Sequence, residues 1–204
     1  MSILSLMMQG GILMYVLLLL SIAVLAIVIE KYRQLAIVKK ANSPVLEILN
    51  LKLNSTALLE KLNEGHAASP IAQVLMKVLA HDTKDKELIT QSLESAANYE
   101  LHKLEKGMGW LSTFSAIAPL IGFLGTVLGM VRVFMNIQHQ SSAGIDINIL
   151  AGGIWEAMLT TIGGLIVGII AIVFYNDIIT RLENILHDMQ DSASQFLVQY
   201  YKES

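Results

Sequence analysis

Three long stretches without a charged residue constrain this chain more than any other feature. Residues 12–29, 107–131 and 157–176 contain no Asp, Glu, Lys or Arg, and they are rich in Leu, Ile, Val, Ala and Gly. A bilayer core about 30 Å thick is crossed by roughly 20 apolar residues in a helix. The sequence therefore predicts an all-α, polytopic membrane protein with three transmembrane helices, and it argues against a secreted domain or a large soluble catalytic core.

The composition removes several classes of function. Only 15% of the 204 residues are charged, whereas soluble domains carry about a quarter. There is no cysteine, and 14 Lys and Arg against 17 Asp and Glu leave no basic excess for nucleic acid. The chain has no phosphate-binding glycine loop, and its five His lack metal-ligand spacing. We expect no enzymatic activity, no catalytic residue, no metal and no cofactor.

The basic residues predict how the chain is oriented. Eleven of the 14 lie between Lys31 and Lys106, in the segment that joins the first two spans. Basic residues collect on the cytoplasmic side of a membrane, so we expect the N-terminus outside and the C-terminus inside. The predicted segments are an outer N-terminal segment 1–11, transmembrane helix 12–29, cytoplasmic helical loop 30–106, transmembrane helix 107–135, outer loop 136–153, transmembrane helix 154–175 and cytoplasmic C-terminal helix 176–204.

Helix signals continue through the charged parts of the chain. Ser43–Pro44 and Ser69–Pro70 each place a capping Ser before a Pro, an order typical of the first residues of a helix. From Lys86 to Pro119 no proline interrupts a helical pattern of apolar residues. The sequence thus predicts two helix starts, and one helix that runs from Lys86 straight into span two. A similar amphipathic helix is predicted to continue span three.

Glu156 is the candidate functional residue. It precedes 20 uncharged positions, and a carboxylate within hydrocarbon costs roughly 2.5–3.5 kcal/mol on insertion scales. It should therefore face protein or a water-filled cavity. The alternative is an interfacial Glu at a helix start, where the helix dipole favours it. Depth decides between them: a helix starting near Ile149 favours function, whereas a start at Ile154 leaves both open.

Other polar residues of the spans are ambiguous. Thr160 lies one turn after Glu156 on the same face, and Thr161 is rotated away from it. Each hydroxyl either serves a polar path with Glu156 or donates to the carbonyl four residues earlier. Arg132, near the outer end of span two, is interpreted as an interfacial anchor whose charged head reaches water.

Small residues on spans two and three predict close helix packing. Gly125 and Gly129 form one small-xxx-small pattern, and Gly164 and Gly168 form another; such patterns let two backbones approach. We expect these spans to form an inner layer and span one to face lipid, with several copies around a shared path. The predicted packing residues are Pro119, Gly122, Gly125, Gly129, Gly163, Gly164 and Gly168.

The span sequences resemble a known family. Residues 118–130, APLIGFLGTVLGM, and the segment from Glu156 (EAMLTT) to Asn176 resemble the second- and third-span motifs of the MotA/TolQ/ExbB proton channel family. Gly10–Gly11 and the Glu30–Lys31 pair after span one are similar to the start of ExbB and TolQ proteins. Three spans resemble ExbB and TolQ rather than MotA, which has four.

This resemblance implies a function and a set of partners. Family members form homopentamers in the bacterial inner membrane, and their pore encloses the single transmembrane helices of an ExbD or TolR dimer. Proton flow past an Asp of that partner drives work at the outer membrane through TonB or TolA. The pore-lining residues carried over are Glu156, Thr161 and Thr126, with Thr160 on the Glu156 face.

The chain departs from the family pattern at one position of the third span, and one alternative function stays open. Ile170 stands where ExbB has Pro, which predicts a straighter third span. The alternative function is a passive membrane scaffold that organises cytoplasmic or envelope partners through its long helices.

Overall fold

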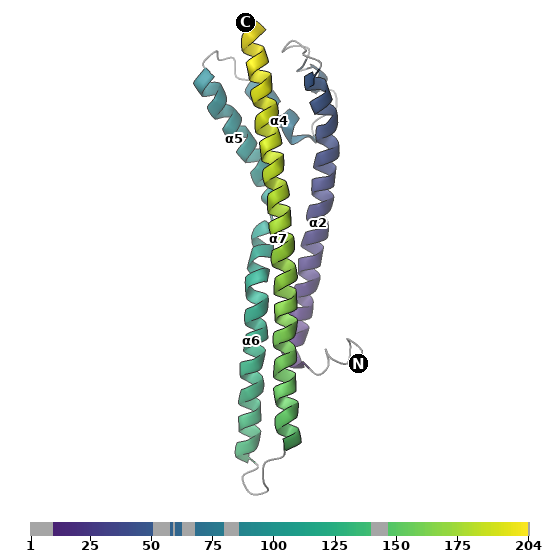
Figure 1. Cartoon of the computed structure of the whole chain (residues 1–204), viewed down its shortest axis with the longest axis vertical. Helices are drawn as coiled ribbons and strands as arrows, with labels where there is room; N and C mark the ends of the chain where they lie inside the picture. The colour runs from purple at the N-terminus through teal and green to yellow at the C-terminus, as the bar shows by residue number, and fades with distance from the viewer. Residues whose placement is uncertain are drawn as a thin grey trace. The chain divides into compact units, whose positions relative to one another are not determined.

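The computed structural model describes residues 10–50, 58, 60–62, 68–79, 86–139 and 147–203. Its main elements are five α-helices: α2 (Gly11–Asn50), α4 (Pro70–Leu79), α5 (Lys86–Glu105), α6 (Met108–His139) and α7 (Ile147–Glu203) (Figure 1). The described residues contain no strand, which confirms the all-α prediction. Residues 1–9 of the predicted outer segment and residues 140–146 of the predicted outer loop lie outside the described ranges.

Three of these helices, α2, α6 and α7, are long and apolar enough to cross a membrane. Their most apolar 18-residue windows are only 17%, 22% and 28% buried within the single chain. Large apolar side chains such as Leu19, Leu120 and Ile169 point outward instead. A soluble protein seldom exposes so large an apolar surface, so this surface fits lipid or other subunits. The prediction of three spans is confirmed.

The chain forms two compact units. The apolar unit comprises Met1–Ile29 and Gly107–Asn176, and the polar unit comprises Glu30–Lys106 and Asp177–Ser204. Helices α2 and α7 contribute to both units, whereas α6 belongs to the apolar unit and α4 and α5 belong to the polar unit. The boundaries after Ile29 and Asn176 fall where the first and third uncharged stretches end.

The apolar unit is built on backbone contact between α6 and the first part of α7, which run alongside one another (Figure 1). A Cβ added to Gly164 would lie 2.5 Å from the Ala118 carbonyl oxygen and 2.9 Å from the Gly122 Cα atom. A Cβ at Gly168 would lie 2.6 Å from the Pro119 ring. Glycine is therefore required at these positions, since any side chain would push the two helices apart.

Helix α2 packs on α7 through its first turns. A Cβ at Gly163 would lie 3.2 Å from the Met14 sulfur and 3.6 Å from Leu17, and Leu17 is almost fully buried. Span one therefore has a packed side as well as a side that exposes Ile12 and Leu19. The exposed side fits the expectation that span one faces lipid, and the packed side attaches the span to α7.

The polar unit has a core of large aliphatic side chains. The core joins the end of α2, α4, α5 and the last part of α7, and its fully buried members include Val45, Ile71, Leu75 and Met189. The predicted helix start at Ser69–Pro70 is confirmed: α4 begins at Pro70, and the Ala72 amide donates to the Ser69 hydroxyl at 3.3 Å. That hydroxyl in turn donates to Asn42 Oδ1 at 2.7 Å.

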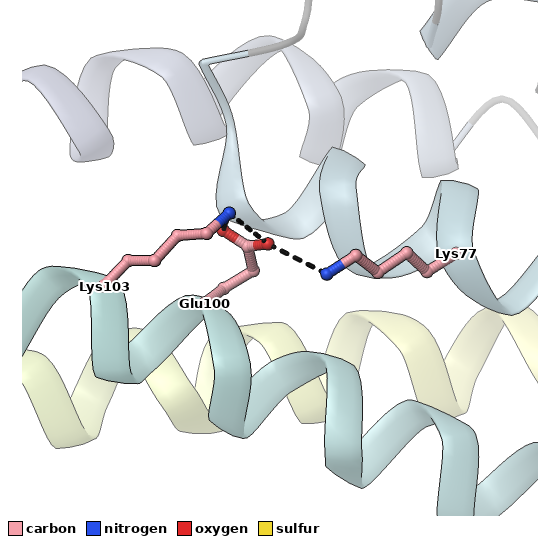
Figure 2. Close-up of polar contacts among 3 residues, drawn as sticks. All are labelled: Lys77, Glu100 and Lys103. Carbon is pink, nitrogen blue, oxygen red and sulfur yellow. Dashed lines mark hydrogen bonds and ion pairs between the residues drawn. The ribbon is translucent and has the colours of Figure 1, made fainter.

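A buried carboxylate also ties α4 to α5. Lys77 of α4 lies 3.3 Å from Glu100 Oε1, and Lys103 lies 2.9 Å from the same oxygen (Figure 2). The Glu100 side chain is only 7% exposed, so the two ammonium groups supply the partners that a buried carboxylate needs. Both ammonium groups also lie over the Tyr99 ring.

Two predicted helix boundaries are wrong. Helix α2 does not restart at Ser43–Pro44 but continues through Pro44 to Asn50. Asn42 and Val45 are buried on either side of this proline, so tertiary packing outweighs the hydrogen bond that proline removes. The predicted helix from Lys86 into span two breaks at Gly107, whose φ of 95° lies in the left-handed region. Lys31 donates to the Leu104 carbonyl at 2.7 Å and caps the end of α5.

Candidate functional site

Glu156 lies well inside its helix. Helix α7 begins at Ile147, nine residues earlier, so the side chain sits about two and a half turns from the helix start. The helix thus begins two residues before Ile149, which places Glu156 slightly deeper than the start near Ile149 would. This depth favours a functional carboxylate over an interfacial one. The Glu156 side chain is 33% exposed in the single chain.

The carboxylate of Glu156 has a basic partner on the neighbouring helix. Arg132 Nη1 of α6 lies 3.1 Å from Glu156 Oε1. These are the only charged side chains among the described residues of the apolar unit. The interpretation of Arg132 as an interfacial anchor stays a prediction, because its side chain is 59% exposed. Its ion pair with Glu156 is an additional contact, of which sequence spacing gave no sign.

The first residue of α2 closes another side of the carboxylate. Gly11 adopts a φ of 67°, and a Cβ there would clash with the same Oε1 atom that Arg132 contacts. Glycine tolerates this backbone conformation without a steric penalty. The guanidinium of Arg132 and the start of α2 therefore both lie against the same carboxylate oxygen.

A small cavity lies beside this ion pair. Its volume is about 20 Å³, which is room for about one water molecule. The cavity brings together residues from α2, α6 and α7, and its wall contains Gly10, Gly11, Ile12, Leu13, Gly125, Leu128, Gly129, Arg132, Glu156 and Thr160. The small residues Gly125 and Gly129 line this cavity and also leave room for the side chains of Thr160 and Ala157 on α7.

The three threonines behave differently. Thr160 lines the cavity and donates to the Ala157 carbonyl at 2.8 Å, and Thr126 donates to the Phe123 carbonyl at 2.6 Å. Thr161 instead donates across the helix interface to the Gly122 carbonyl at 2.9 Å. The structure therefore brings Glu156 and Thr160 together in one cavity, whereas Thr126 and Thr161 lie outside its wall.

A second polar cluster lies in the polar unit and was not predicted. Tyr32 donates to Asp177 Oδ2 at 2.5 Å, and Arg181 Nε donates to the same oxygen at 2.7 Å. The hydrogen bond from Arg181, and then that from Tyr32, lowers the pKa of Asp177 below its usual range. The bond to Asp177 in turn raises the pKa of the Tyr32 hydroxyl. A Tyr–Asp pair 145 positions apart leaves no signal in the sequence.

The site offers no ligand set for a metal. In the part of the chain that the structure describes, no three His, Asp or Glu side chains lie close enough to hold one ion. What the arrangement of Glu156, Arg132 and a water-sized cavity can do is hold, release and exchange a proton on a single carboxylate.

Comparison with known proteins identifies the family. The profile of the MotA/TolQ/ExbB proton channel family matches residues 66–191. The chain belongs to this family. The match contains Arg132, Glu156 and all the predicted glycines of spans two and three, whereas Gly11 precedes it.

Relatives within the MotA/TolQ/ExbB family are named as ExbB-type transport proteins. The chain is 32% identical to an ExbB-like biopolymer transport protein of Synechocystis sp., over 83% of this chain and 81% of that one. It is 25% identical to an ExbB homologue of Methanothermobacter thermautotrophicus, over 90% of this chain and 65% of that one. Identity to the biopolymer transport protein ExbB of Xanthomonas campestris pv. campestris is 35%, over 52% of this chain and 44% of that one. The chain is thus a multi-pass membrane protein of a transport and channel family.

Proposed function

We propose that this chain is the proton-conducting subunit of an inner-membrane motor that uses the proton motive force to energise work at the outer membrane. The observation that carries the proposal is Glu156, an acid two and a half turns inside an apolar helix, paired with Arg132 beside a water-sized cavity. Family membership gives independent support. The output is ExbB-like transport or TolQ-like envelope maintenance.

Energy for this work comes from the proton gradient itself. One elementary charge that crosses 100 mV is worth about 2.3 kcal/mol, so repeated proton steps supply mechanical work without a bound nucleotide. In each step Glu156 takes up a proton, becomes neutral and loses its attraction to Arg132. Thr160 lines the same cavity, and we assign Thr126 and Thr161 to the polar path on the assembled protein.

Several copies are needed to enclose such a path. Three spans cannot surround a channel, and their outward side chains include Leu120, Phe123 and Val173, each more than half exposed. A pentamer buries much of this surface between copies and leaves the rest to lipid. Its axis holds the single helices of an ExbD- or TolR-like dimer, which contributes the titrating Asp, and the work passes to a TonB- or TolA-like protein.

The proposed orientation follows the basic residues. The N-terminus and residues 136–153 lie in the periplasm, and residues 30–106 and 176–204 lie in the cytoplasm. In this arrangement Arg132 and Glu156 lie toward the periplasmic ends of their spans, where protons enter from the side of higher electrochemical potential.

The test is proton flux through the full chain, purified with its one-span partner and reconstituted into liposomes. Glu156→Gln removes the proton-accepting group and is expected to abolish flux. Glu183→Gln, an exposed carboxylate on the polar part of α7, is the matched control and is expected to keep it. Undiminished flux in Glu156→Gln would overturn the proposal. Unchanged envelope work in that variant, with loss of work when residues 86–107 are deleted, would favour the scaffold alternative.

A further inference from the structure

We propose that Arg132 is the gate of the Glu156 proton site. In the resting subunit its guanidinium holds the carboxylate and keeps the path closed to protons, and the path opens when an acidic side chain of a partner helix draws the guanidinium away. The inference rests on the proposed function, because it assigns regulation to the same site. Arg132 acts here as a positioning residue, since Glu156 is the group that carries the proton.

The first step is the isolation of the pair. Arg132 is the only Lys or Arg between Gly107 and Asn176, and Met1–Ile29 has none. Glu156 faces this one cation at 3.1 Å, and the Oε1 atom that accepts the bond also lies against Gly11. No other described charged group of the apolar unit can replace Arg132. Among the described residues of the apolar unit, Arg132 is therefore the one counter-charge available to Glu156.

The second step is that the Arg132 side chain is more exposed, and so freer to move, than the Glu156 side chain. The Arg132 side chain is 59% exposed, whereas the Glu156 side chain is 33% exposed and lies behind Gly11. A long arginine side chain reaches water while its base stays packed, so the guanidinium can leave without any movement of helix α6. Glu156, which is less exposed and is bordered by residues of three helices, remains in place.

The third step is the consequence for the proton. A carboxylate that loses its only counter-charge in an apolar setting is costly, and taking up a proton removes that charge. The adjoining cavity has room for about one water molecule to deliver it. An acid on a partner helix competes with Glu156 for the guanidinium, so partner movement and proton uptake become coupled.

The experiment measures passive proton entry into liposomes that contain the full chain without a partner, driven by a potassium diffusion potential and reported by a pH-sensitive dye. Arg132→Gln is expected to raise entry by roughly tenfold, the rate change that follows from the loss of one charge-assisted hydrogen bond. Arg132→Lys, which keeps the charge, should stay close to the original chain.

Two further variants separate gating from a loss of packing. Arg132→Gln combined with Glu156→Gln should return entry to the level of Glu156→Gln alone, because the leak passes through the carboxylate. Glu156→Asp keeps the acid but withdraws it from Arg132, so it should leak even if Arg132→Gln fails to assemble.

The outcomes distinguish this inference from the proposed function. Fast proton entry in the double variant would overturn the gate. It would show that Arg132→Gln admits protons through a structural defect and not through the Glu156 carboxylate. The gate would also be overturned if Arg132→Gln and Glu156→Asp both admitted protons no faster than the original chain. The proposed function would still stand in that case, provided that Glu156→Gln abolishes proton flux in the partner complex. Flux that persists in Glu156→Gln with the partner would instead reject the proposed function itself.

Discussion

The apolar unit and the polar unit of this chain are held together in opposite ways. In the polar unit, large aliphatic side chains such as Ile71 and Leu75 are fully buried. In the apolar unit, the closest contacts are made at positions with no side chain, including Gly122 and Gly164, and large side chains point outward. Water drives large apolar groups inward, whereas lipid does not, so packing in the membrane depends on close approach of backbones.

The same contrast applies to charge. The polar unit uses its ion pairs for structure, as Glu100 does when it joins α4 to α5 through Lys77. The apolar unit has one described pair, Arg132 with Glu156, and places it beside a cavity. A charge that is costly to keep in lipid and yet is retained points to function. The lesson is that substitutions should have opposite effects in the two units.

In the polar unit, replacing a large buried residue with a small one should cause the largest loss of stability. Leu75→Ala removes a fully buried side chain of α4 and is expected to destabilise the protein by about 2–5 kcal/mol through lost burial and a cavity. Thermal unfolding of the purified chain measures the loss. Leu88→Ala on α5, where the leucine is half exposed, is the control. Equal effects of the two would show that the described core does not hold this unit.

In the apolar unit, replacing a small residue with a larger one should lower the stability. Gly164→Val places side-chain atoms against the Ala118 carbonyl and the Gly122 backbone and should cost about 1–3 kcal/mol, the range for overpacking. The control is Gly152→Ala on the same helix, where an added Cβ meets nothing within 4 Å. Unfolding in detergent and oligomer size give the readout. A stable Gly164→Val protein would mean that α6 and α7 do not meet here.

A smaller effect is expected at the buried carboxylate of the polar unit. Glu100→Gln leaves Lys77 and Lys103 facing each other without the charge between them (Figure 2). Because both lysines are about half exposed, the expected loss is only about 1 kcal/mol. Unfolding at low and high salt is the measurement, with exposed Glu94→Gln of α5 as the control. An identical response in both variants would remove any structural role for Glu100.

The smallest effect is expected at the Tyr32–Asp177 pair, and it should depend on pH. The pKa of Asp177 is lowered by Arg181 and Tyr32, so its contribution to stability is present above about pH 4 and is lost as pH falls further. The pKa of Tyr32 is raised by Asp177, so its contribution is lost only as pH rises beyond about 10. The difference in melting temperature between the original chain and Tyr32→Phe should therefore shrink at both extremes, and a constant difference would contradict this.

Much of the fold could be predicted because each membrane span is a continuous run of apolar residues in the sequence. The uncharged stretches located all three spans, and Ser69–Pro70 located the start of α4. The break at Gly107 was missed because glycine in a helical pattern is ambiguous, and its left-handed backbone is visible only in three dimensions. Pro44 was misjudged for a similar reason, since burial of its neighbours decides the outcome.

The candidate site could be predicted only in part. Glu156 stood out because an acid before a long apolar run is costly, and that argument needs no partner. The role of Arg132 could not be foreseen, because 24 positions separate it from Glu156 and the helix register that joins them is set by contacts such as Gly129 against Ala157. The contribution of Gly11 likewise depends on where α2 begins.

The position of Glu156 in the assembled protein tests the proposal most directly. Cryo-electron microscopy of the full chain in lipid nanodiscs, purified with its one-span partner, would reveal where these carboxylates lie. We expect five copies whose Glu156 side chains surround a hydrated axis occupied by the partner helices. Carboxylates that point toward acyl chains, or a closed assembly with no space for a foreign helix, would contradict a proton-driven motor.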